Sequence, residues 1–256
     1  MKGFSAFLKK EFRELIRTKR LLILLCTALI FGIMNPAIAK LTPMLYEMMA
    51  DELAAQGMTI REITVTAADA WAQFHKNMPL LLIVTLILNS GIYTAEYSGG
   101  TLIPLLTKGL SRSAVVLSKY MAMLLTWSAG LWLCWGVTYF YSGYYWDNSA
   151  VHSLLFSGVG WWLFGIMLLS CNAFFSAFAN SGAQVILGTG AVYFIMMLLQ
   201  MVGKIKQYVP LRLTESTALY QNSLKPSDCI CAVSVTAVLS VLFLLTALPL
   251  TRRRQI

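Results

Sequence analysis

The chain has few groups that could carry out chemistry on a substrate. Only two of its 256 residues are histidines, and neither His75 nor His152 has a second histidine, cysteine or carboxylate at metal-ligand spacing. The Gly-x-x-x-x-Gly-Lys-Ser/Thr pattern of phosphate-binding loops is absent. We therefore expect no catalytic residue, no metal and no cofactor in this chain, and any ATP must be bound by another polypeptide.

Cysteine pairs suited to a metal or a disulfide are also missing. Of the five cysteines, Cys26, Cys134 and Cys171 fall within apolar runs, and Cys229 and Cys231 are one residue apart. That spacing suits neither a common zinc site nor an easily formed disulfide. We expect all five to be packing residues.

Charge is scarce as well, at 12% of residues against 58% hydrophobic residues. This composition is typical of an integral membrane protein. A hydrocarbon core of roughly 30 Å needs about 20 apolar residues per helix, and six uncharged runs are long enough. We predict an all-α, single-domain membrane protein over residues 1–256, with spans at about 21–39, 79–95, 120–141, 151–179, 183–203 and 229–250.

The distribution of lysine and arginine predicts the orientation of these spans. With the N-terminus in the cytoplasm, thirteen basic residues lie on the cytoplasmic side and seven on the other. The excess favours two cytoplasmic termini in the cell membrane, although four basic residues between 204 and 225 oppose it. The net charge is +9, and most of the basic residues lie beside predicted membrane spans. No sequence motif for nucleic-acid binding accompanies them. We therefore expect lipid, not nucleic acid, as their counterion.

Two segments outside the spans have helical periodicity. Before the first span, an apolar face with basic residues opposite predicts an amphipathic helix in the inner interface, within residues 1–20. Its apolar residues are Phe4, Phe7, Leu8, Phe12 and Leu15, and its basic residues are Lys9, Lys10, Arg13 and Arg17. In the loop over residues 40–78, two apolar stripes predict a cap on the outer interface; a substrate lid is the alternative. These stripes are Met44, Leu45, Met48, Met49 and Leu53, then Trp71, Phe74 and Met78.

Ionisable groups well inside a span would indicate ion-coupled transport, because protons or ions bind there. The polar residues within the predicted spans are neutral, such as Asn35 and Asn89, and Glu96 stands at the end of the second span. Secondary transport is therefore disfavoured but stays an alternative.

A polar segment between the second and third spans carries the most information. It reads Glu96-Tyr97-Ser98-Gly99-Gly100-Thr101, then Thr107-Lys108-Gly109-Leu110-Ser111-Arg112, and ends near Lys119. The glycines can bend the chain, and Ser111 can cap a helix that begins at Arg112 or Ser113. Glu96 can pair with Arg112, with Lys119 or with the N-terminal basic helix, or it can be a solvated helix end.

This segment resembles the first cytoplasmic loop of ABC transporter permeases of the ABC-2 class. The six spans, the preceding amphipathic helix and the long first outer loop match that layout along the whole chain. The resemblance implies a coupling helix between spans 2 and 3 that docks on a separate ATPase. It assigns an ATPase-coupling role to Glu96, Gly100, Thr101, Leu102, Thr107, Ser111, Arg112 and Lys119. Many members have proline where this chain has Leu110, which puts the start of the following helix in doubt.

The resemblance further implies a permease that exports its substrate, with two cytoplasmic ABC ATPase subunits and a second permease copy or homologue. ATP and magnesium would be bound by the ATPase. Tryptophans and methionines in the spans suit a hydrophobic or amphipathic substrate, and they equally suit lipid contact. A membrane scaffold or immunity-type protein and an intramembrane enzyme are the remaining alternatives.

Overall fold

Six long helices dominate the computed structural model, which describes residues 2–48, 64–100, 102, 104, 107 and 109–253. No strand occurs within these residues, and six helices are long and apolar enough to cross a membrane. They are α2 (Arg20–Met48), α4 (Ala67–Ser98), α6 (Arg112–Tyr145), α7 (Leu154–Ser176), α8 (Gly182–Gln200) and α10 (Ile230–Arg253). The all-α class is confirmed for these residues, and the number of candidate membrane-spanning helices equals the number of predicted spans.

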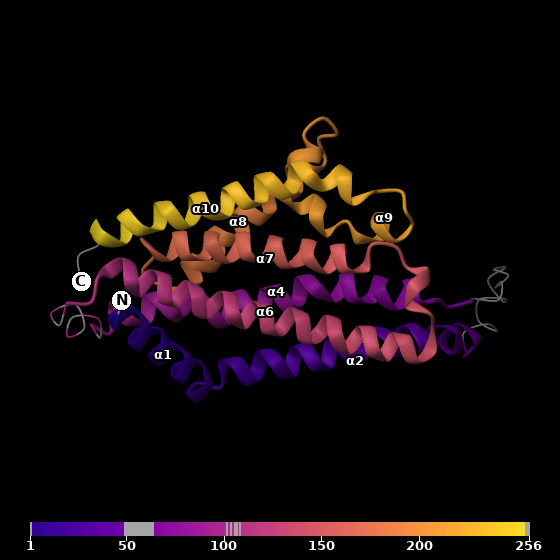
Figure 1. Ribbon diagram of the computed structural model, residues 1–256, viewed down its shortest axis with the longest axis horizontal. Helices are drawn as coiled ribbons and strands as arrows, with labels where there is room; N and C mark the ends of the chain where they lie inside the picture. The colour runs from indigo at the N-terminus through magenta and orange to yellow at the C-terminus, as the bar shows by residue number, and fades with distance from the viewer. Residues whose placement is uncertain are drawn as a thin grey trace.

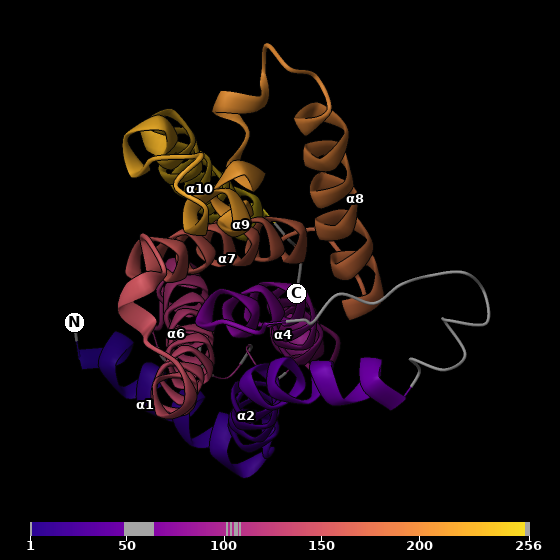
Figure 2. The same ribbon diagram turned by 90° about the vertical axis from the view of Figure 1, so that its right-hand side faces the viewer.

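The six helices lie side by side along the longest axis of the molecule (Figure 1). In the view along that axis, α4 and α6 lie between α2 and α7, and α8 and α10 stand beyond α7 (Figure 2). The start of helix α1 (Lys2–Arg17) and the end of α10 lie at the same end of the bundle, which we call the terminal end. The opposite end is called the distal end.

Large side chains from α4, α6 and α7 fill the centre of the bundle. Trp71, Phe74, Trp127 and Phe164 are fully buried, because these three helices are covered on both sides by others. In contrast, α2, α8 and α10 expose most of their apolar residues. These outer helices therefore present the surface that meets lipid or another membrane chain.

Several helices extend beyond the predicted spans. Helix α2 continues through Pro43 to Met48, α4 begins at Ala67 rather than residue 79, and α6 begins at Arg112 rather than residue 120. Polar residues lie at these ends, and the helical backbone continues through them beyond the apolar runs. Inside a membrane protein a helix tolerates proline because neighbours satisfy the freed backbone groups.

The prediction of a surface cap over residues 40–78 is wrong for its second stripe. Trp71, Phe74 and Met78 belong to the first turns of α4 and are fully buried in the core. Met44, Leu45 and Met48 continue α2 and are exposed, whereas Met49 and Leu53 lie outside the described residues. Periodicity identified both helical faces, but it could not tell a face packed in the core from one lying on lipid.

Short helices cover the distal end. They are η1 (Asn148–Ala150), η2 (Lys206–Tyr208), η3 (Pro210–Thr214), α9 (Ser216–Tyr220) and η4 (Pro226–Cys229). Within this region Lys206 Nζ lies 2.6 Å from Glu215 Oε1. Lys206 is one of the four basic residues between 204 and 225 that oppose the predicted orientation, and Glu215 neutralises its charge.

His75 connects this distal region to the core. Trp161 Nε1 donates to His75 Nδ1 at 2.7 Å, and His75 Nε2 is hydrogen-bonded to the hydroxyl of Tyr220. Tyr220 in turn contacts Ser157 Oγ at 3.0 Å. Because both ring nitrogens are used, His75 holds α9 against α4 and α7.

Close helix packing depends on two glycines. A Cβ on Gly165 would lie 2.3 Å from the indole of Trp127, and one on Gly188 would lie 2.5 Å from the ring of Phe175. Both positions therefore need glycine for packing inside one chain.

Candidate functional site

The predicted polar segment lies at the terminal end, between α4 and α6. Gly100 has φ of +62° and Gly109 has φ of +88°, conformations that glycine adopts at little cost. Ser111 is the N-cap of α6, and its side chain accepts a hydrogen bond from the backbone N–H of Ala114 at 3.2 Å. The predicted bend and the predicted Ser111 cap are both confirmed. The start of α6 at Arg112 also removes the doubt raised by Leu110.

An apolar cluster attaches this segment to the N-terminal helix. Leu102 from the segment, Phe7 from α1 and Val115 from α6 are all buried and pack together. Tyr97 and Leu110 are partly buried and pack against this cluster. Burying side chains of this size stabilises the arrangement by roughly 1.5–3 kcal/mol each. The segment is therefore anchored on α1 through Leu102.

A buried ion cluster lies beside the apolar cluster. Lys119 Nζ lies 3.1 Å from both carboxylate oxygens of Glu11 and 3.0 Å from Glu96 Oε2. Lys119 is fully buried, and only 1% of Glu11 and 8% of Glu96 are exposed. These three residues come from α6, α1 and α4, so one ammonium group joins three helices.

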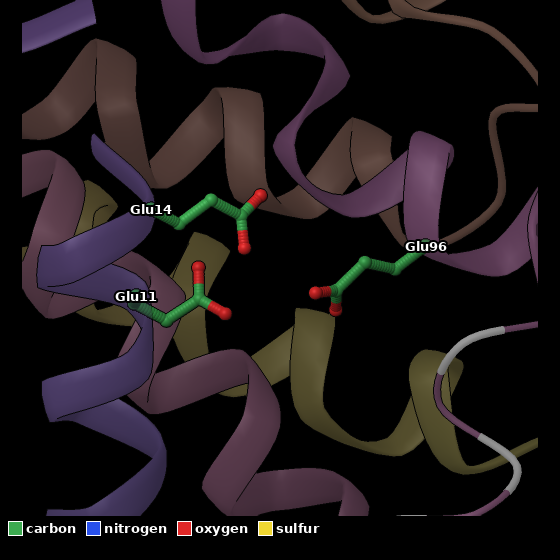
Figure 3. Close-up of side chains that lie close together, drawn as sticks. All are labelled: Glu11, Glu14 and Glu96. Atoms are coloured by element: carbon green, nitrogen blue, oxygen red, sulfur yellow. The ribbon is translucent and has the colours of Figure 1, made fainter. Parts of the chain in front are cut away.

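Lys10 completes the cluster from the surface side. Its Nζ lies 3.0 Å from Glu11 Oε1 and 2.7 Å from Glu14 Oε2, and it also pairs with Glu96 Oε1. In Figure 3 the carboxyl groups of Glu11 and Glu14 on α1 point toward that of Glu96 on α4. Lys10 and Lys119 thus place two positive charges against three carboxylates.

The surroundings shift the pKa values of Lys10 and Glu14, the two members of the cluster nearest the surface. Partial burial lowers the pKa of Lys10, but hydrogen bonds to Glu14 and Glu96 outweigh it, so the pKa is raised above the usual lysine value. Burial also raises the pKa of Glu14, but its hydrogen bond and charge interaction with Lys10 prevail and lower it. Both groups are therefore charged near neutral pH.

The carboxylates of Glu11, Glu14 and Glu96 offer oxygens within 4.8 Å of one another, a spacing that could hold a metal ion. Lys10 Nζ already contacts all three, so the cation that they share in the structure is an ammonium. Removing one partner of a buried ion pair typically costs about 3–5 kcal/mol, because the other charge is left uncompensated. The cluster therefore acts as a fixed junction between α1, α4 and α6.

Arg112 extends this junction to the last helix. Its Nη1 donates a hydrogen bond to the backbone carbonyl of Thr251 in α10 at 3.4 Å. Thr251 is buried, and its hydroxyl bonds to the carbonyl of Ala247 within the same helix. The start of α6 is thereby tied to the end of α10.

The predicted site residues fall into two groups. Glu96, Leu102 and Lys119 are buried and join helices, whereas Thr107 and Ser111 are exposed at the end of the bundle. Gly100 and Arg112 are half-buried, so they belong to neither group. Thr101 lies outside the described residues. Pro104 and Thr107 have helical backbone. Glu96 does pair with Lys119 and with the N-terminal helix, as two of the predicted alternatives stated.

Sequence reasoning missed Glu11 and Glu14. Lys10 was assigned to the polar face of the amphipathic helix, yet it contacts three carboxylates. A signal was available, because Glu11 lies four residues from both Phe7 and Leu15 on the apolar stripe of α1. An acid on an apolar stripe needs a buried partner, and Lys119 is that partner.

A comparison with protein families identifies the class of transporter to which the chain belongs. The sequence profile described as ABC-2 family transporter protein matches residues 5–249. The chain belongs to the ABC-2 family of transporter membrane proteins. Members of this family are permeases without an ATPase domain, so the ABC-2 chain is the membrane component of a transporter that works with a separate ATPase. A search of curated proteins found no match.

Proposed function

We propose that this ABC-2 protein is the permease subunit of an ATP-driven exporter, and that its ATPase docks on residues 99–111 at the terminal end. The observation that carries the proposal is the junction of Glu11, Glu96 and Lys119 directly behind this segment. A docking loop can transmit force only if it is firmly attached to the spans. The buried junction and the Leu102 anchor supply that attachment.

The proposed contact surface consists of the exposed part of the segment. Thr107, Gly109 and Ser111 are exposed, and Arg112 stands at the first position of α6. In this proposal Glu96, Leu102 and Lys119 do not touch the ATPase, because they are buried; they pass its movement to α1, α4 and α6. The helical backbone at Pro104 and Thr107 supports the expected coupling helix.

The remaining features of the proposal rest on the family resemblance. We propose two permeases and two ATPases per complex, both termini in the cytoplasm of the cell membrane, and outward movement of a hydrophobic or amphipathic substrate. The common location of the start of α1 and the end of α10 supports the shared side of the termini. The exposed apolar surfaces of α2, α8 and α10 are available for lipid or for the second permease.

The docking proposal is tested by placing a charge on the exposed segment. Thr107→Lys should weaken co-purification of the ATPase, or leave the complex intact but abolish substrate stimulation of ATP hydrolysis. Ser223→Lys is the matched control, because Ser223 is an exposed hydroxyl residue that follows α9 at the distal end and, like Thr107, donates a hydrogen bond to a nearby backbone carbonyl. Equal ATPase recovery and equal stimulation in both variants would refute docking on this segment.

Arg112→Glu provides a second, stronger perturbation. Because Arg112 also bonds to Thr251, its effect must be read together with the amount of folded permease recovered. A folded Arg112→Glu permease that binds and stimulates the ATPase normally would count against the same assignment.

A further inference from the structure

An aromatic cavity at the distal end is not used by the proposed ATPase coupling. It has a volume of about 1030 Å³, comparable to the upper range of small-molecule sites at roughly 300–1,000 Å³. It lies between the last turns of α6, the η1 segment and the start of α7. The aromatic side chains that line it are Trp135, Tyr139, Phe140, Tyr144, Tyr145 and Trp146.

Helix α6 presents four of these rings as two pairs of neighbours. Trp135 and Tyr139 are four residues apart, and so are Phe140 and Tyr144, so the members of each pair lie on the same face of the helix. Trp135 and Tyr139 stack with ring centroids 5.1 Å apart, and Tyr144 meets Tyr145 edge to face at 4.9 Å. The rings thus hold one another in place before any ligand binds.

The floor of the cavity is fixed by Asn148. Its Nδ2 donates to the carbonyl of Tyr139 at 2.8 Å, and its Oδ1 accepts from Trp71 Nε1 at 3.1 Å. Gly143 makes this possible, because a Cβ there would lie 3.1 Å from Asn148 Nδ2. The cavity is therefore a built feature of the chain rather than a gap between loose side chains.

Among the described lining residues, Asp147 alone carries a full charge. Its carboxylate accepts hydrogen bonds from the hydroxyl of Ser149 at 2.7 Å and from the backbone N–H of Ser149 at 2.9 Å. These bonds lower the pKa of Asp147, so the group is an anion at neutral pH. An anion beside aromatic faces favours a cation over any other ligand charge.

The chain itself already places a cation on one of these rings. Lys40 Nζ lies 3.5 Å from the centroid of Tyr145, which is within the distance of a strong cation–π contact. Phe140 and Tyr144, in contrast, are each 79% exposed and have room for an incoming group.

We propose that this aromatic cavity binds an amphipathic organic cation, with the cationic centre beside Asp147 and the apolar part against Phe140 and Tyr144. An ordinary interfacial aromatic belt would explain scattered tyrosines and tryptophans. It would not explain a fixed floor and an oriented carboxylate among them. The proposal concerns binding only and does not depend on where the ATPase docks.

Tetraphenylphosphonium is a suitable probe, and tetraphenylborate is its control because it has the same shape and the opposite charge. Binding of both is measured by calorimetry on the purified chain in lipid nanodiscs, with the signal of empty nanodiscs subtracted. We expect the phosphonium to bind and the borate to bind at least about tenfold more weakly. Asp147→Asn keeps an oxygen for Ser149 but removes the charge, and it should weaken phosphonium binding by about fivefold or more.

Tyr144→Leu tests the aromatic wall, and because Tyr144 is so exposed its removal should leave the fold intact. Tyr208→Leu is the control, since Tyr208 is another exposed tyrosine, in η2 and outside the cavity. Loss of binding in Asp147→Asn and Tyr144→Leu, but not in Tyr208→Leu, supports the proposal. Equal binding of both probes, or no effect of Asp147→Asn, would overturn it in favour of a lipid-contact surface. Absence of phosphonium binding together with a disulfide between two copies of Tyr144→Cys would overturn it in favour of a permease interface.

Discussion

Lys119 Nζ lies 3.1 Å from each carboxylate oxygen of Glu11, across 108 positions of sequence and with both side chains 1% exposed. Glu11 stands on the face of α1 that packs against α6, between the buried residues Phe7 and Leu15. The N-terminal helix is therefore part of the bundle at its terminal end, in addition to being amphipathic.

The first prediction concerns this ion pair. Lys119→Met should reduce the free energy of unfolding by about 3–5 kcal/mol, because Glu11 then stays buried with less compensation. The free energy is measured by denaturation in mixed detergent micelles. Lys9→Met is the control, since Lys9 is an exposed lysine in the same turn of α1 as Lys10 and Glu11. The double variant Lys119→Met with Glu11→Gln should recover part of the loss; a loss no larger than that of the control would contradict the assigned role.

A second prediction concerns helix packing. Gly165→Ala should destabilise the chain by about 1–3 kcal/mol, because the new Cβ would overlap the indole of Trp127 at 2.3 Å. Gly136→Ala is the matched control, since Gly136 lies within α6 and, outside the local helix, no atom of the described residues lies within 4 Å of the added Cβ. The control should be neutral or slightly stabilising, because alanine favours helix over glycine. Equal melting temperatures for the two variants would show that α6 and α7 pack differently.

The third prediction follows from the pKa of Glu14, which is lowered from 4.5 by Lys10. A lowered pKa means that the contribution of Glu14 to stability is complete above pH 4.5 and is lost as the pH falls through the folded-state value. The raised pKa of Lys10 has the opposite sign, so its contribution is complete below 10.5 and lost at higher pH. The stability difference between the natural chain and Glu14→Gln should thus be constant between these limits and shrink in acid. The free energy of unfolding of both chains, measured over a series of pH values, checks this. A stability difference that does not change in acid would show that the Lys10–Glu14 pair is not its source.

The fourth prediction concerns orientation. In a background with the exposed native cysteines Cys26 and Cys231 changed to serine, a membrane-impermeant thiol reagent should label Ser223→Cys but not Ser5→Cys in intact cells. Ser5 lies exposed on α1, whose start is at the terminal end, and Ser223 lies exposed shortly after α9, which is at the distal end (Figure 1). Permeabilised cells should label both positions. Labelling of Ser5→Cys alone without permeabilisation would reverse the proposed topology.

The sequence by itself determined the membrane class, the six spans, the N-terminal helix, and the bend and cap at Gly100 and Ser111. These features depend on local rules, because a chain in hydrocarbon must satisfy its backbone within each helix and glycine and serine act on their nearest neighbours. The motif around Glu96 also identified the family correctly, since its residues are contiguous in sequence.

Only the tertiary structure decided which charges meet and which apolar faces are buried. Lys119 is polar in sequence yet fully buried, and Trp71 and Phe74 were expected at the surface yet lie in the core. From sequence, Glu96 could pair with Arg112, Lys119 or the N-terminal helix or stand unpaired at a solvated helix end, and the part of Glu11 was not foreseen. The same holds for the distal cavity, where Asn148 reaches α4 through Trp71. Such contacts depend on how helices far apart in the chain cross one another, and periodicity within one helix carries no information on its partner.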